Sequence, residues 1–412
     1  MSAAGAVGTD LKTLAERLWT PVGDPDWPVT VSFDPPPPGH VIAEEYIVVP
    51  DLRRPKFLVP VAARSASRAA FSRYLTTSSL RTRALGYVSA AGFGSPVGER
   101  VMGARLFVGI NSAIPRDEWS RWLLLRHLEE VLGATDLVAY LPVRRAVPNA
   151  KPTLRLFERG GRPMGYVKVG WSLATRAVVR NEAAALAAVQ NRLRLLRAPQ
   201  LSASGVWQGN EYAVAAPLPK GVRSYTEEPS TTPQLLLDIA QSGDVSRGPL
   251  VDSSFARRVH GDLALASANQ PEASEVLLQW LQRLEARPHE LDFGRWHGDF
   301  VPWNLGRTAA GPVAWDWEYS DPDVPVGFDL VHWHFQHRLS PADGTLVAAM
   351  RVADEQAPRL TSLGVAPGST GQVTSLYLLD MFTRSVRMAA AGAGWNAKFY
   401  PAMLDLARTR DV

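Results

Sequence analysis

The 412-residue sequence contains no cysteine. Disulfide bonds, thiolate metal sites and cysteine nucleophiles are therefore all excluded. The chain also has no run of about 20 uncharged apolar residues, which a membrane-spanning helix would need. Its first residues, MSAAGAVGTDLKTLAERLW, lack the basic region and long apolar run of a signal peptide. We therefore expect a cytoplasmic protein without a membrane partner.

The chain has little net charge, +4 from 44 basic and 40 acidic side chains. Basic residues gather in the front part, at Arg53, Arg54, Lys56, Arg64, Arg68 and Arg73. These residues lack the interleaved aromatic side chains and the known module that would indicate a nucleic-acid site. A solvated surface is the favoured interpretation over an anionic partner, and we expect no nucleic-acid binding.

The length and the 46% hydrophobic content predict a globular protein of two or three packed units. Residues 1–115 form an accessory α/β segment, with two short strands in EEYIVVPDLRRPKFLVPV and a helix in SASRAAFSRYL. Within 116–216, a helix over 116–133 precedes a strand, a hairpin around Gly160-Gly161, a long helix from 172 and a further strand. Residues 217–412 are mostly helical. This order predicts an α+β protein.

One stretch carries the chemistry: HGDFVPWNLGRTAAGPVAWDWE, residues 297–318. A hairpin between Asn304 and Asp316 would bring Asp316 back close to Asp299. That arrangement suits phosphoryl transfer, with Asp299 accepting the proton of a hydroxyl and Asn304 and Asp316 offering oxygen ligands to Mg²⁺. The triplet HGD also occurs at 260–262, but Ser267 stands where the Asn should be. We interpret that copy as a helix cap or loop.

The motif HGDFVPWN followed by DWE resembles the aminoglycoside phosphotransferase family, whose two-lobed fold is similar to the protein kinases. The resemblance covers about residues 120–412. It implies a small β-rich N-lobe, a larger helical C-lobe, ATP and Mg²⁺ as cofactors, and a small-molecule hydroxyl acceptor as partner.

The resemblance also implies roles for individual residues outside the hairpin. Lys168 in GYVKVG would hold nucleotide phosphates, and Glu182 would fix its ammonium group. The adenine would bond to backbone groups near Val214 to Ala216. His297 would order the catalytic loop, and Asp329 in PVGFDL would support that loop by hydrogen bonds.

The expected phosphate-covering loop departs from the kinase pattern, because VRRAVPNAK contains no glycine. Either Arg144, Arg145 or Lys151 replaces the backbone amides of that loop, or the grip on phosphate is weak. The Gly/Ser-rich segment 86–98 offers no substitute, since no Gly-Lys-Ser/Thr follows it.

Acceptor identity is the least defined property. Glu318, Asp321 and Asp323 would favour a cationic acceptor such as an amino sugar or aminoglycoside, although Asp-Pro-Asp is also ordinary turn chemistry. Trp303 is a candidate for stacking on a sugar ring. The same role is open to Trp317, Trp333 and Trp395, and a place in the core is equally open to all four. A catalytically silent nucleotide-binding protein is the alternative to an enzyme.

Overall fold

The computed structural model describes residues 9–20, 26–61, 104–144, 149–395, 398–400 and 402–410, which fall into two compact units. The first unit comprises residues 1–180 and 201–221, and the second comprises 181–200 and 222–412. The change of unit falls within helix α6 (Leu173–Val189). Residues 1–115, which we expected to be separate from 116–216, belong to the same unit as 116–180 and 201–216, whereas 181–200 belong to the second unit.

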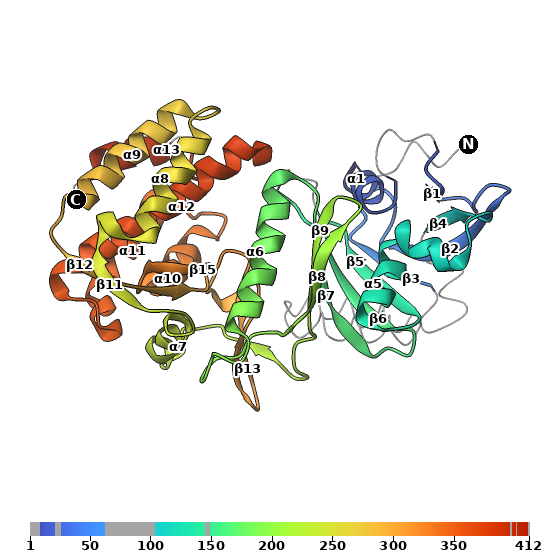
Figure 1. The fold of residues 1–412 in the computed structure, drawn as a ribbon, viewed down its shortest axis with the longest axis horizontal. Helices are drawn as coiled ribbons and strands as arrows, with labels where there is room; N and C mark the ends of the chain where they lie inside the picture. Colours follow the sequence, from blue (N-terminus) through green and yellow to red (C-terminus); the bar gives the residue numbers. More distant parts are fainter. Residues whose placement is uncertain are drawn as a thin grey trace. The chain divides into compact units, whose positions relative to one another are not determined.

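A single antiparallel sheet organises the first unit. Among the described residues, nine strands lie in the order β1-β4-β2-β3-β5-β6-β7-β9-β8 (Figure 1). Phe57 of β3 pairs with Pro142 of β5, so the front segment continues the sheet of residues 116–216. The strands are β1 (Val29–Ser32), β2 (His40–Val49), β3 (Phe57–Pro60), β4 (Arg105–Asn111), β5 (Leu137–Pro142), β6 (Thr153–Glu158), β7 (Pro163–Gly170), β8 (Leu201–Trp207) and β9 (Asn210–Ala215).

The main core of this unit lies on one face of the sheet. Side chains alternate along a strand, so Leu154 and Leu156 of β6 and Val167 and Val169 of β7 point into that core. Helices α1 (Thr9–Leu18) and α5 (Leu124–Leu132) contribute further leucines to it. The opposite face therefore presents the alternate side chains of β6 and β7, among them Lys168.

Two local predictions have different outcomes here. The hairpin around Gly160-Gly161 is confirmed, since β6 pairs with β7 and Gly161 has a φ of +90°. The single helix expected over 116–133 is instead a 3₁₀ turn (Arg116–Arg121) followed by α5, because Leu123 is extended. The helix expected in SASRAAFSRYL and the Gly/Ser-rich segment 86–98 lie outside the described residues.

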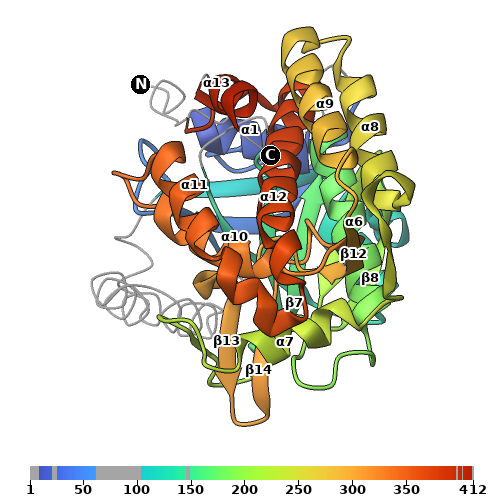
Figure 2. The ribbon, with the colours of Figure 1, turned by 90° about the vertical axis from the view of Figure 1, so that its left-hand side faces the viewer.

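The second unit is mainly helical. Helices α8, α9 and α12 pack against one another, α13 packs on α9, and α10 and α11 pack on each other and on α12 (Figures 1 and 2). The helices are α7 (Thr232–Ala240), α8 (Ser254–Ala266), α9 (Pro271–Glu285), α10 (Phe328–Leu339), α11 (Leu346–Glu355), α12 (Thr370–Met388) and α13 (Ala402–Thr409). The α+β class is confirmed. Across the described ranges, no helix has the length and apolar character to cross a membrane.

Short strands of the second unit frame the HGD segment. One sheet has the order β11-β12-β15 and the other the order β10-β13-β14. These strands are β10 (Arg223–Ser224), β11 (Ser246–Pro249), β12 (Glu290–Trp296), β13 (Leu305–Thr308), β14 (Gly311–Ala314) and β15 (Asp321–Pro325).

The first HGD triplet, expected as a helix cap or loop, lies within α8. The reason is that Ser253 already caps this helix, accepting a hydrogen bond from the amide of Ala256, so the helix begins well before His260.

Candidate active site

The loop that carries the second HGD triplet begins where β12 ends. Gly298 has a φ of +84°, and a Cβ on it would overlap the backbone carbonyl of Tyr319. The carboxylate of Asp329, at the start of α10, accepts hydrogen bonds from the amides of His297 (2.6 Å) and Gly298 (3.1 Å). Burial raises the pKa of Asp329 to about 7, although these two backbone donors oppose that rise. Asp329 therefore anchors the turn to α10.

The Asp299 carboxylate is held at both oxygens. Its Oδ1 lies 3.0 Å from Nε2 of His332, and its Oδ2 accepts a 2.7 Å hydrogen bond from Nδ2 of Asn304. Burial acts to raise the pKa of Asp299, but the hydrogen bond with His332 and neighbouring basic groups, Arg384 among them, oppose it, and the pKa is lowered. The side chain is still 25% exposed. Asp299 is thus an ionised, oriented carboxylate that a substrate can reach.

His297 contacts the backbone of Asp299. Its Nδ1 accepts a 3.2 Å hydrogen bond from the Asp299 amide, and its buried ring packs 4.4 Å from the ring of Trp317. These contacts fix the path of the loop and leave the orientation of the Asp299 carboxylate to other side chains.

The hairpin expected after Asn304 is present. Strands β13 and β14 pair with Leu305 opposite Ala314, and the next residue, Trp315, donates its amide to the carbonyl of Asn304 at 3.0 Å. Asp316 follows with a φ of +73°, a left-handed conformation that is uncommon outside glycine and is often found at functional sites. The hairpin register therefore returns Asp316 to the Asn304 end of the loop.

Three carboxylates meet beside this hairpin. Oxygens of Glu182, Asp316 and Glu318 lie within 4.8 Å of one another, and Glu182 and Glu318 are buried. The Nδ2 atom of Asn181 donates to the carbonyls of Glu318 (3.0 Å) and Ser320 (2.8 Å), which holds the segment after Asp316 against α6. Hard oxygen donors grouped in this way are suited to a divalent cation such as Mg²⁺. Glu182, expected beside Lys168, is thus grouped with the metal candidates within its own unit.

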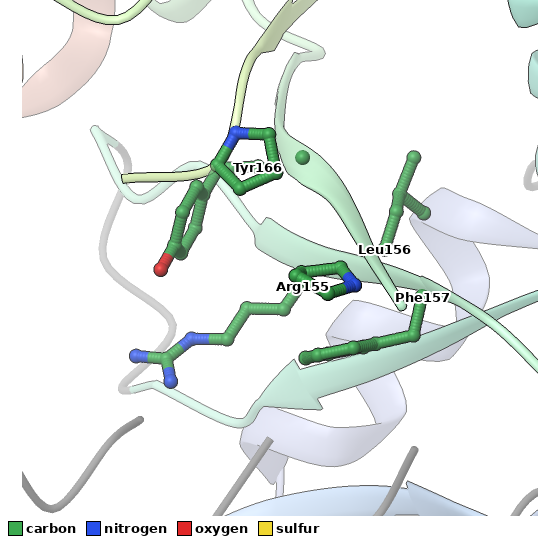
Figure 3. A pocket seen from close by; sticks show the side chains of 7 residues that line it. Arg155, Leu156, Phe157 and Tyr166 are labelled. Carbon is green, nitrogen blue, oxygen red and sulfur yellow. The ribbon is translucent and has the colours of Figure 1, made fainter. Parts of the chain in front are cut away.

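Lys168 lies on β7 in the first unit, on the same sheet face as Tyr166 two residues before it. A small pocket opens on this unit between β6, β7 and Pro217. Figure 3 shows Arg155 and Phe157 of β6 beside Tyr166 of β7, and the Arg155 guanidinium lies 5.7 Å from the Tyr166 ring centre. Val214 is buried in β9, and Ala216 follows that strand directly before Pro217.

The acidic residues expected to attract a cationic acceptor are engaged elsewhere. Glu318 belongs to the carboxylate cluster, and Asp321 forms a 2.7 Å ion pair with Arg258 of α8. Asp323 accepts a hydrogen bond from the Ser254 hydroxyl. The sequence pattern predicts that these carboxylates are uncompensated. That premise is wrong for Asp321, because Arg258 comes from a helix about 60 residues earlier in the chain.

The tryptophans divide between surface and core. Trp303, one residue before Asn304, is 47% exposed. Trp317 and Trp333 are only 0% and 3% exposed, so they belong to the core and cannot stack on a ligand. Trp395 stacks on Tyr400 with ring centres 4.9 Å apart. Trp303 is therefore the tryptophan of this set that combines exposure with a place in the loop that follows the second HGD triplet.

Sequence reasoning missed His332. It lies three residues after Asp329, so the two side chains share one face of α10. That i, i+3 spacing in FDLVH was the available signal, since a helix that sends Asp329 toward the loop also sends His332 there.

No protein-family model and no curated protein sequence matches this chain. Solved structures do match. An apo thermostable mutant of the aminoglycoside phosphotransferase APH(4)-Ia is 14% identical, with a TM-score of 0.40, over 69% of this chain and 99% of its own. The amicoumacin kinase hAmiN, in complex with AMP-PNP, Ca²⁺ and Ami, is 12% identical with a TM-score of 0.42, over 72% and 95%. Macrolide 2′-phosphotransferase MphH from Brachybacterium faecium is 14% identical with a TM-score of 0.35, over 70% and 98%.

Similarities of this size assign no function to the chain.

Proposed function

We propose that this protein is an ATP-dependent phosphotransferase that phosphorylates a hydroxyl group of a small molecule. The observation that carries the proposal is the Asp299 carboxylate, ionised and held at both oxygens, in a loop whose hairpin returns Asp316 to Asn304. The resemblance of HGDFVPWN and DWE to the aminoglycoside phosphotransferases supports the same reaction class.

Asp299 acts as the base of the reaction. Its carboxylate orients the acceptor hydroxyl and takes its proton as the hydroxyl oxygen forms a bond to the γ-phosphorus. The bond between that phosphorus and the bridging oxygen breaks, and ADP leaves with its electron pair. The lowered pKa of Asp299 keeps it ionised before each turnover.

The metal ligands proposed are Asn304 and Asp316, with Glu182 and Glu318 close to Asp316. When bound there, Mg²⁺ would neutralise part of the charge of the nucleotide phosphates. The fit of these residues to the ion is supported by their chemistry, because each offers a hard oxygen atom.

Lys168 is proposed to pair with the nucleotide phosphates, and backbone groups near Val214 and Ala216 to bond to the base. The second assignment is supported by the pocket between β6 and β7, since one of its lining residues, Pro217, directly follows Ala216. Trp303 is proposed to stack on the acceptor. Because Arg258 compensates the charge of Asp321, we expect that carboxylate to give no preference for an amine, and we propose a sugar-like acceptor.

A screen of hydroxyl compounds with Mg²⁺-ATP tests the proposal, with ADP release and phosphorylated product measured together. The set pairs neutral sugars with their amino analogues, because equal turnover of the two is expected. Binding of ATP with no transfer to any acceptor would favour the alternative, a catalytically silent nucleotide-binding protein. The combination of Asp299, Asn304 and Asp316 favours the enzyme.

A further inference from the structure

A buried histidine, His332, contacts the proposed base, Asp299. His332 is 1% exposed, and its two ring nitrogens contact two different partners. Nε2 lies 3.0 Å from Oδ1 of Asp299, and Nδ1 lies 3.0 Å from the hydroxyl oxygen of Tyr377 on α12. Tyr377 itself is fully buried. Two consecutive hydrogen bonds thus connect Tyr377, in the core of the helical unit, through His332 to Asp299.

The chemistry of the partners fixes the direction of both hydrogen bonds. An ionised Asp299 has no proton to give, so Nε2 of His332 carries the proton and donates it. Burial lowers the pKa of His332, which keeps the ring neutral and leaves Nδ1 as an acceptor. Burial also raises the pKa of Tyr377, so its hydroxyl keeps its proton and donates to Nδ1. The order of donation is Tyr377 to His332 to Asp299.

We propose that His332 is a positioning residue for Asp299, locking the carboxylate through Oδ1 in the orientation from which it accepts the acceptor's proton. Asn304 holds Oδ2 from the other side, so neither oxygen is free to rotate away. His332 is not a proton relay, because Nε2 already carries a proton and cannot take a second. The inference rests on the proposed function, since positioning has meaning only if Asp299 works as the base.

Two variants separate positioning from packing. In His332→Gln the amide nitrogen extends about as far as Nε2 and can still donate to Asp299. In His332→Asn the amide nitrogen lies nearer the position of Nδ1, so the donor to Asp299 is lost. Both side chains are polar and smaller than or similar to histidine. Tyr377→Phe is the matched control, since it removes the outer hydrogen bond and keeps the inner one.

The kinetic result expected is a split between kcat and KM. His332→Asn should lower kcat about 10- to 100-fold, the effect of a lost hydrogen bond to a charged group. The KM values for ATP and acceptor should not change, and His332→Gln should recover most of the lost kcat. Tyr377→Phe should retain more activity than His332→Asn. Equal kcat for His332→Asn and the wild type, or equal losses in the Asn and Gln variants, would overturn the proposal.

A second measurement does not depend on turnover. Imidazole ¹⁵N NMR of the full chain should report the Nε2–H tautomer for His332, assigned by the signal missing from His332→Gln. In Asp299→Ala this signal should shift, because its acceptor is gone. An Nδ1–H tautomer in the wild type would overturn the inferred hydrogen bond. Absence of transfer to any acceptor, with the Nε2–H tautomer present, would instead overturn the proposed function and the positioning role with it.

Discussion

The glycines of the two HGD triplets occupy opposite backbone environments. Gly298 has a φ of +84°, and a side chain there would meet the carbonyl of Tyr319. Gly261 lies in α8, where an added Cβ would meet nothing within 4 Å. The same three letters therefore form a left-handed turn that requires glycine at one site and an ordinary helical turn at the other.

This difference predicts opposite effects for one substitution. Gly298→Ala should lower the free energy of unfolding by about 2 kcal/mol or more, because it adds both overlap and a disfavoured φ. Gly261→Ala should raise it by about 0.5–1 kcal/mol, since alanine is the better helix former. Urea unfolding of the two variants checks this. Equal changes in both variants would contradict the assigned turn at Gly298.

Trp303 gives a second prediction for a single residue. Trp303→Ala should raise the acceptor KM about 2- to 10-fold, which is the size expected for loss of a ring contact, and leave the ATP KM unchanged. The control is Tyr400→Ala, since Tyr400 is 45% exposed but stacks on Trp395. Steady-state kinetics with varied acceptor and varied ATP distinguish the two. Unchanged acceptor KM in Trp303→Ala would remove Trp303 from the acceptor site.

At the scale of elements, the β13–β14 hairpin was predictable and its surroundings were not. Turn residues and alternation in LGRTAAGPVAW define a hairpin locally, and its register brings Asn304 and the residue before Asp316 together. The acidic residues that follow were misread, because the ion pair of Asp321 with Arg258 joins β15 to α8. Turns and strand alternation can be predicted from a short stretch of sequence. Ion pairs between distant elements cannot, because they depend on how those elements pack.

The hairpin leads to a prediction for Asp316. Asp316→Ala should weaken binding of ATP in the presence of Mg²⁺ more than binding of ATP without the ion, because the variant loses a proposed metal ligand. Calorimetry under both conditions measures the difference. If the two affinities fall equally, Asp316 serves the structure of the hairpin rather than the metal.

Glu228 forms a second contact between distant elements, and its carboxylate becomes protonated only in acid. The Glu228 carboxylate forms a 2.6 Å ion pair with Arg359, and its Oε2 lies 3.0 Å from Nε2 of His334 on α10. Burial acts to raise its pKa, but the hydrogen bonds with His334 and Arg359 outweigh it and lower the pKa from 4.5 to about 2. The folded pKa is below the unfolded one, so this stabilisation is complete above about pH 4.5 and is lost as the pH falls toward 2.

Glu228→Gln should therefore destabilise the protein by about 1–2 kcal/mol at neutral pH, allowing for solvent screening of this partly exposed group. The difference between the variant and the wild type should shrink as the pH falls below about 4. Urea unfolding across this range measures it. A difference that stays constant with pH would show that Glu228 acts by packing alone.

At the scale of the whole chain, composition and element order were enough to predict a β-rich part followed by a helical part. They did not predict that β1 to β4 would continue the sheet of β5 to β9. The pairing of β3 with β5 joins two separate segments, and neither segment alone has a sequence pattern that indicates it. Likewise the sequence indicated Asp299 but not His332, whose contact depends on how α10 packs behind the loop.

Asp299 is proposed as the base of a phosphoryl transfer, and a comparison of two matched variants tests this role. The rate of transfer from Mg²⁺-ATP to an accepted hydroxyl compound is measured for Asp299→Asn and for Asp262→Asn, the same change in the helical HGD copy. We expect Asp299→Asn to lower the rate about 10²- to 10⁴-fold with the fold and ATP binding retained. Asp262→Asn weakens a partly buried ion pair to Arg258 and a more exposed one to Arg387, neither of which involves Asp299, and should stay near the wild-type rate. Near-wild-type transfer by Asp299→Asn would contradict the account.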